Sequence, residues 1–148
     1  MLTANTVGYA GDLDPKDAYA ALAADPAAVL VDVRTVAEWT FVGLPALQSI
    51  AKEPILLEWQ RYPSMGRDPE FEAKLTKLLA ARGAGPTTSI YFLCRSGGRS
   101  RDAAIAMTET GFTACFNVAT GFEGPPDEHG HRGLRAGWKA SGLPWAQS

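Results

Sequence analysis

The stretch YFLCRSGGRSRDAA, residues 91–104, combines a nucleophile with positive charge and little side-chain bulk. Cys94 ends an apolar run, two glycines follow at positions 97 and 98, and arginines stand at positions 95, 99 and 101. Glycine has no Cβ, so the backbone can curl there and aim successive N–H groups at one point, where they bind an anion. The same groups, with the start of a helix, would stabilise a thiolate, which is the nucleophilic form of cysteine. The stretch therefore predicts a thiolate cradle that also attracts anions.

Each of these features also has an ordinary structural explanation. A cysteine after a strand is often a small buried apolar residue, and a group of arginines is often a solvated surface. The combination of strand end, paired glycines, arginines and helix start favours a catalytic Cys94. Cys115 lies inside ACFNV without such neighbours, and we expect it to belong to the core.

The elements that position Cys94 alternate along the chain. Short apolar runs at 28–33, 89–93 and 114–118 are typical of strands buried on both faces. Helical patterns cover 14–25, 68–83 and 100–111, and a short terminal helix is expected at 137–142. Strands that alternate with helices predict an α/β fold with a mainly parallel central sheet and helices on both faces. Cys94 would then stand at the carboxyl edge of the sheet, where ligands of such folds bind.

Length, charge and cysteine content limit the function further. The chain has 148 residues, which fits one domain, and a formal net charge of −2, which favours neither nucleic acid nor a membrane surface as partner. No apolar run approaches the 18 or so residues of a membrane span, and we expect no signal peptide. Two cysteines outside a CxxC pair argue against a zinc site and a disulfide framework. We therefore expect a cytoplasmic protein without metal or cofactor.

Three parts of the chain together resemble the rhodanese-like sulfurtransferases. VLVDVRTVAEW, residues 29–39, is similar to the first signature of that family, with Asp32, Arg34 and Glu38 at its charged positions. CRSGGRS, residues 94–100, is similar to its six-residue active loop and the helix start that follows. GFTACFNVATGFEG and GWKASGLPW resemble its C-terminal pattern. The resemblance implies one rhodanese-like three-layer domain over 1–148, with a core at about 14–145 and insertions at 53–69 and 124–133.

The resemblance also implies an activity. The protein would be a sulfurtransferase that moves sulfane sulfur from a donor such as thiosulfate to a thiophilic acceptor, through a persulfide on Cys94. Donor and acceptor would be small molecules or proteins. The substrate and the persulfide charge would be held by the loop residues Arg95, Ser96, Gly97, Gly98, Arg99 and Ser100. A structural role is expected for Asp32, Arg34 and Glu38, as a set of salt bridges and hydrogen bonds that ties the first strand to the loop after it.

Two alternatives remain beside sulfur transfer. Cysteine phosphatases on this fold have an arginine six positions after the cysteine, whereas that position here is Ser100. Arg99 and Arg101 fall five and seven positions after Cys94. The ring that the active loop forms around a bound atom is therefore sized for sulfur, and we expect Arg99 to close this ring. Phosphate or arsenate chemistry therefore ranks low. A binding or regulatory module that has lost catalysis also ranks below an enzyme, because such modules usually lack the cysteine.

Other residues leave more than one interpretation open. The family's histidine after the first signature is absent from GLPALQSI, residues 43–50. His129 and His131 lie in the loop 124–133 with Asp127 and Glu128, but such a pair rarely completes a metal site. This loop either overhangs Cys94 and selects substrates or is a solvated insertion. Four aromatic residues are expected either to form a wall of the pocket or to pack in the core, namely Trp59, Tyr62, Phe122 and Trp138.

Overall fold

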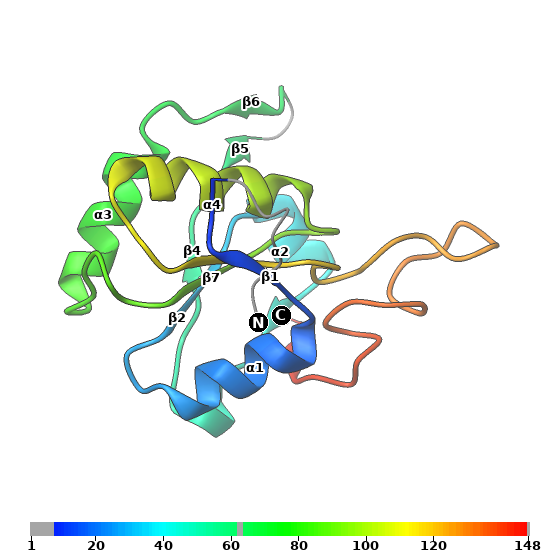
Figure 1. Ribbon diagram of the computed structural model, residues 1–148. Helices are drawn as coiled ribbons and strands as arrows, with labels where there is room; N and C mark the ends of the chain where they lie inside the picture. Colours follow the sequence, from blue (N-terminus) through cyan, green and yellow to red (C-terminus); the bar gives the residue numbers. More distant parts are fainter. Residues whose placement is uncertain (1–7, 62–63, 148) are drawn as a thin grey trace.

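The computed structural model describes residues 8–61 and 64–147, and its centre is a five-stranded sheet in the order β1-β8-β7-β2-β4 (Figure 1). All neighbouring strands of this sheet are parallel. Its strands are β1 (Gly11–Leu13), β2 (Val29–Asp32), β4 (Ile55–Leu56), β7 (Ile90–Leu93) and β8 (Cys115–Val118). The helices are α1 (Pro15–Ala24), α2 (Val36–Phe41), α3 (Phe71–Ala81) and α4 (Gly98–Thr110), with a short 3-10 turn η1 (Gln48–Ile50). The expected α/β fold with a mainly parallel sheet is confirmed.

The sheet has a hydrophobic core on each face. Along β7, Ile90 and Phe92 belong to the cluster under α3 and α4, whereas Tyr91 and Leu93 belong to the cluster that α1 covers. Successive residues of a strand point to opposite faces, so a strand buried on both sides must be apolar throughout. Figure 1 shows the resulting three layers, with α3 and α4 on one side of the sheet and α1 on the other.

The expected helices form, with two differences. On α3, Phe71, Leu75 and Leu79 are buried, but Leu78 lies at the edge of the buried face and is 41% exposed. The prediction of a terminal helix at 137–142 is wrong. These residues form turns, and the chain then forms β9 (Trp145–Ala146), which pairs antiparallel with β3 (Leu44–Pro45). Three glycines between 133 and 142 have positive φ, a conformation that interrupts helical geometry.

The two stretches expected to be insertions differ in structure. Residues 53–69 contain the edge strand β4 of the central sheet and a small hairpin of β5 (Gln60–Arg61) and β6 (Gly66–Arg67). Residues 124–133 form bends and turns without a helix or strand, and they extend away from the sheet (Figure 1). Among the described residues, we find no helix with the length and apolar character that crossing a membrane requires.

Candidate active site

Cys94 follows the last residue of β7 and is 1% exposed. Its Sγ accepts a hydrogen bond from the backbone N–H of Gly97 at 3.1 Å and lies 3.2 Å from the Ser100 hydroxyl. The 13-residue helix α4 begins at Gly98, so its positive end lies next to the sulfur. One loop N–H and the positive end of a helix thus lie next to the sulfur.

The active loop is fixed from behind by the turn that follows β8. Phe122 donates its N–H to the Cys94 carbonyl at 2.8 Å, and the N–H groups of Glu123 and Gly124 donate to the Arg95 carbonyl at 3.0 and 3.1 Å. Gly97 has φ of 108°, and a Cβ there would collide with the Ala119 carbonyl. The carbonyls of Cys94 and Arg95 are bound on this side, and the Gly97 N–H reaches the sulfur from within the loop.

A second hydrogen-bonded chain leads from the sulfur through the sheet. The Ser100 hydroxyl lies 2.5 Å from Asn117 Oδ1, and Asn117 Nδ2 donates to Asp12 on β1 at 3.1 Å. Asp12 also accepts from the Tyr9 hydroxyl. Ser100 and Asn117 are both buried, whereas Asp12 is exposed. Asn117 was not predicted as a site residue, although a polar side chain inside the apolar run ACFNV was the signal for it.

Asp32 and Arg34 form a buried ion pair next to the loop. Both side chains are 0% exposed, and their closest contact, from Arg34 Nη2 to Asp32 Oδ2, is 2.7 Å. Arg34 also donates to the Gly43 carbonyl at 2.8 Å and lies over the Phe122 ring at 4.2 Å. Phe122 in turn holds the Cys94 carbonyl. The pair therefore joins the end of β2 to the turn behind the active loop.

Glu38 and Arg99 form a two-bond ion pair, with N–O distances of 2.7 and 2.9 Å. This corrects the expectation that the Arg99 side chain closes the ring around the sulfur, because its guanidinium is bound to α2. Burial opposes ionisation of Glu38, but hydrogen bonds and charge from Arg99 outweigh it, and the pKa of Glu38 lies below its usual value. Burial likewise opposes the charge of Arg99, yet Glu38 raises its pKa. Both groups therefore stay charged at neutral pH.

Glu38 has a second structural function. Thr35 and Glu38 form a reciprocal cap at the start of α2, in which the Thr35 hydroxyl accepts from the Glu38 N–H and the Glu38 carboxylate accepts from the Thr35 N–H. From the sequence, Glu38 is expected to tie the first strand to the loop after it. The observed contacts instead tie that loop and α2 to the active loop.

The remaining loop residues differ in exposure. Ser96 and Gly98 are exposed, and Arg95 points its charge toward solvent without a side-chain hydrogen bond or ion pair among residues 8–61 and 64–147. Arg95 and Arg99 line one side of a pocket of about 590 Å³, which α2 and the β5–β6 hairpin complete. Arg95 is therefore the arginine of the active loop that can meet an incoming anion.

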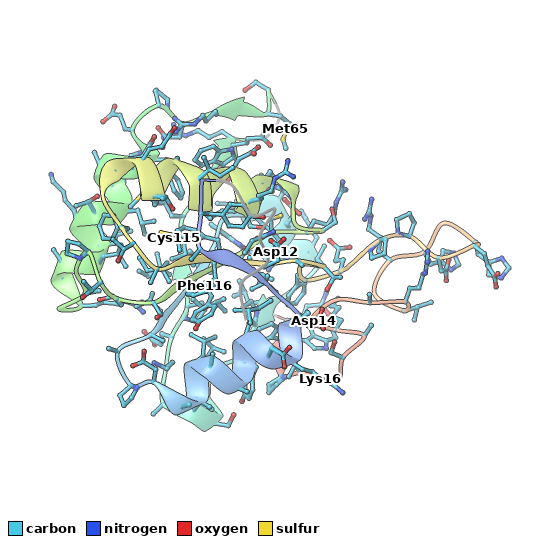
Figure 2. All side chains as sticks on the ribbon, viewed as in Figure 1. Asp12, Asp14, Lys16, Met65, Cys115 and Phe116 are labelled. Atoms are coloured by element: carbon cyan, nitrogen blue, oxygen red, sulfur yellow. The ribbon has the colours of Figure 1, made fainter. Side chains whose placement is uncertain are left out.

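Cys115 lies in β8 beneath α4 and is 0% exposed (Figure 2). Burial raises the pKa of its thiol to about 11, so it stays protonated at neutral pH. Both cysteines are free thiols. The two sulfurs therefore have different surroundings, and Cys94 is the one with a loop N–H and a helix N-terminus beside it.

The loop 124–133 is held mainly by its own contacts. The Asp127 carboxylate accepts from the N–H groups of His129 and His131, and Arg132 donates to the Gly124 carbonyl. None of its residues lines the pocket beside Arg95. In the described part of the chain, no three histidine, cysteine or acidic side chains converge as metal ligands would.

The aromatic residues named from the sequence are mostly core residues. Trp59, Phe122 and Trp138 are at most 6% exposed, and Trp59 packs edge-to-face against Phe71. Tyr62 lies outside the described residues. The apolar wall of the pocket is instead formed by residues that the sequence analysis did not assign to the site, above all Phe41 and Met65.

A five-stranded parallel sheet with a cysteine loop at its carboxyl edge, opening directly into a helix, defines this chain as a rhodanese-like protein. More specifically, it belongs to the STR4 middle domain family, whose sequence pattern matches residues 11–148. Its structure is similar to the crystal structure of Rv0390 from M. tuberculosis, with a TM-score of 0.83 and 46% identity over 95% of this chain and 99% of that one.

The chain is also similar to three further proteins. An uncharacterized protein of Rickettsia conorii is 38% identical over 86% of this chain and 90% of its own length. The chloroplastic rhodanese-like domain-containing protein 4 of Arabidopsis thaliana is 28% identical over 89% of this chain but only 25% of its own length. The polysulfide-sulfur transferase of Wolinella succinogenes shares the fold, with a TM-score of 0.55 and 24% identity over 93% of this chain and 78% of that one.

Proposed function

We propose that the protein is a sulfurtransferase that carries sulfane sulfur as a persulfide on Cys94. The observation that carries the proposal is the pair of positive groups beside Sγ, which are the Gly97 N–H at 3.1 Å and the N-terminus of α4. These groups would stabilise the negative charge of a thiolate and then of the terminal persulfide sulfur. The free, reduced cysteines suit a reducing compartment such as the cytoplasm.

The reaction has two steps and no net redox change. The Cys94 thiolate attacks the outer sulfur of thiosulfate, the S–S bond of the donor breaks, and sulfite leaves with the bonding electron pair. An acceptor thiolate or cyanide then attacks the outer sulfur of the persulfide, and Cys94 leaves as thiolate. Each step exchanges one bond to sulfur for another, so ping-pong kinetics are expected.

Intact-mass spectrometry after incubation with thiosulfate tests the proposal. We expect a gain of one sulfur atom on Cys94, removal of that sulfur by cyanide, and no gain in Cys94→Ala. Cys115→Ala should gain sulfur as the wild type does. A wild-type protein that stays unmodified over a range of donors and pH would contradict the proposal and favour a binding module.

Phosphatase chemistry has less support from the site. Phosphatases have an arginine six positions after the cysteine, and the arginine next to that position here is Arg99. Glu38 binds both terminal nitrogens of the Arg99 guanidinium. A phosphate bound over Cys94 would lack the bidentate arginine contact that its charge requires. Hydrolysis of p-nitrophenyl phosphate at a rate similar to sulfur transfer would contradict this conclusion.

A further inference from the structure

The pocket beside the active loop has walls of two chemical kinds. Its volume of about 590 Å³ lies within the range of small-molecule sites. The active loop contributes Arg95 and Arg99, α2 and the β5–β6 hairpin contribute apolar side chains, and Thr35, Glu38 and Gln60 add polar groups. A site of this kind suits a ligand with an apolar body and one anionic group.

The charge available to such a ligand is that of Arg95. Arg99 has a full carboxylate partner in Glu38, with both contacts shorter than 3.0 Å. Arg95 is exposed, and within the described residues its guanidinium makes no hydrogen bond or ion pair. Since its backbone carbonyl is held by Glu123 and Gly124, Arg95 stays next to the sulfur while its side chain remains available.

The apolar wall is exposed to an unusual degree. Phe41 is 77% exposed at the end of α2, and Met65 is 39% exposed in the turn of the hairpin. Figure 2 labels Met65 at the β5–β6 side of the molecule. Met65 also has φ of 58°, a left-handed conformation that non-glycine residues rarely adopt because it is strained. A large apolar side chain at such a turn position, beside Gly66, gains no core packing in return. Both features are explained if the two side chains contact a ligand.

We propose that this pocket binds the organic part of the sulfur donor, which is a low-molecular-weight organic persulfide that carries a carboxylate. The inference rests on the proposed function of Cys94. Arg95 would pair with the carboxylate, and Phe41 and Met65 would contact the carbon body. Inorganic thiosulfate has no apolar part, so it would use the loop without this wall.

The transfer step balances without an oxidant. The Cys94 thiolate attacks the terminal sulfur of R–S–SH, a new S–S bond forms to Cys94, and the S–S bond of the donor breaks. The products are the Cys94 persulfide, which keeps the proton, and R–S⁻, which takes the bonding electron pair. R–S⁻ then leaves the pocket as an ordinary carboxylate-bearing thiol.

A comparison of three donors tests the proposal by single-turnover labelling of Cys94. The donors are the persulfide of N-acetylcysteine, the persulfide of its methyl ester, and thiosulfate. We expect the wild type to favour the carboxylate over the ester by about tenfold. Arg95→Gln should remove this preference, and Met65→Ser and Phe41→Ser should slow both organic donors about three- to tenfold while thiosulfate changes less than twofold. Two matched controls, Arg135→Gln and Leu134→Ser, alter an exposed arginine and an exposed leucine outside the pocket and should change nothing.

Binding separates this inference from the proposed function. N-acetylcysteine should bind the Cys94→Ala protein in a calorimetric titration, and its affinity should fall at least fivefold in the Cys94→Ala, Arg95→Gln protein. Absence of binding, or equal affinity in both, overturns the inference even if thiosulfate still labels Cys94. If no donor labels Cys94, the proposed function fails, whereas binding would still report on the pocket. Met65→Ser and Phe41→Ser variants that lose thiosulfate and organic donors equally would show a structural role of these side chains and overturn the inference. Loss of a protein partner without any change in binding N-acetylcysteine would identify the surface as a protein-docking site instead.

Discussion

Glu38 and Arg99 lie 61 positions apart in the chain and meet in an ion pair with contacts of 2.7 and 2.9 Å. The pair joins the first turn of α2 to the first turn of α4, and both side chains are less than 20% exposed. It therefore determines two properties at once. It holds α2 beside the active loop, and it removes the charge of Arg99 from the set of groups that can bind substrate.

Glu38→Gln should lower the free energy of unfolding at pH 7 by about 1–3 kcal/mol, because a mostly buried guanidinium loses its anion. The folded-state pKa of Glu38 lies below its unfolded value, so its stabilising contribution is complete above the unfolded pKa of about 4.3 and is lost as pH falls through the folded pKa. The difference between wild type and variant should therefore shrink in acid. Urea denaturation at pH 7 and pH 3 measures it.

The control for this prediction is Glu128→Gln. Glu128 is 86% exposed and lies 3.7 Å from His129, so its loss should change stability by no more than about 0.5 kcal/mol. A Glu38→Gln protein as stable as this control at pH 7 would show that the ion pair contributes nothing to folding.

Gly97→Ala should abolish the cradle while leaving most of the fold intact. Its φ of 108° and the position of the Ala119 carbonyl leave no room for a Cβ, so the loop must move and the N–H bond to Cys94 Sγ must lengthen. We expect labelling of Cys94 by thiosulfate to slow at least tenfold. Gly111→Ala is a matched control, because Gly111 also has a positive φ, of 118°, but no atom lies near the place that a Cβ would take. Gly111 also lies at the far end of α4 from Cys94. Both variants should lose stability, but only Gly97→Ala should lose activity.

The three middle strands of the central sheet, β8, β7 and β2, were predictable because they carry their own signal. A strand covered on both faces needs continuous apolar residues, as in β2 and β7, and the local sequence shows this directly. The position of Cys94 at the sheet edge followed from the same pattern. By contrast, β1, β3 and β9 have at most three residues, and their pairing depends on distant parts of the chain. Such short strands have no periodicity to recognise.

The side-chain partners within the site were less predictable than the elements. Arg99 has the right spacing to face the sulfur, and nothing in the local sequence indicates that Glu38 will bind it instead. The pocket wall also depends on how a hairpin folds over α2, which places Met65 beside the active loop. Contacts between residues far apart in the chain are determined by tertiary packing, and local patterns do not encode them.

Cys115→Ala should separate the two thiols by function. The residue is fully buried and its pKa is raised to about 11 by burial, so it holds no thiolate at neutral pH. We expect sulfur transfer to stay within about twofold of wild type, and stability to fall by about 1–2 kcal/mol because a small cavity forms. Steady-state transfer from thiosulfate to cyanide and urea denaturation measure the two effects. Loss of transfer by a stably folded variant would assign Cys115 a role in the reaction.

Asn117 should control the direction of the Ser100 hydroxyl and, through it, the reactivity of Cys94. The Asp12 carboxylate only accepts hydrogen bonds, so it turns the amide N–H₂ of Asn117 toward itself and leaves Oδ1 facing Ser100. Ser100 must then donate its one proton to Asn117, and the thiolate of Cys94 is left without that donor. Asn117→Ala frees the hydroxyl to donate to the thiolate, so alkylation of Cys94 by iodoacetamide at pH 6 should become about three- to tenfold faster. Asn117→Asp places a carboxylate there, which holds the Ser100 proton more firmly and repels the thiolate, and alkylation should slow. Equal rates in all three proteins, with cooperative unfolding retained, would show that the hydroxyl is not committed to Asn117.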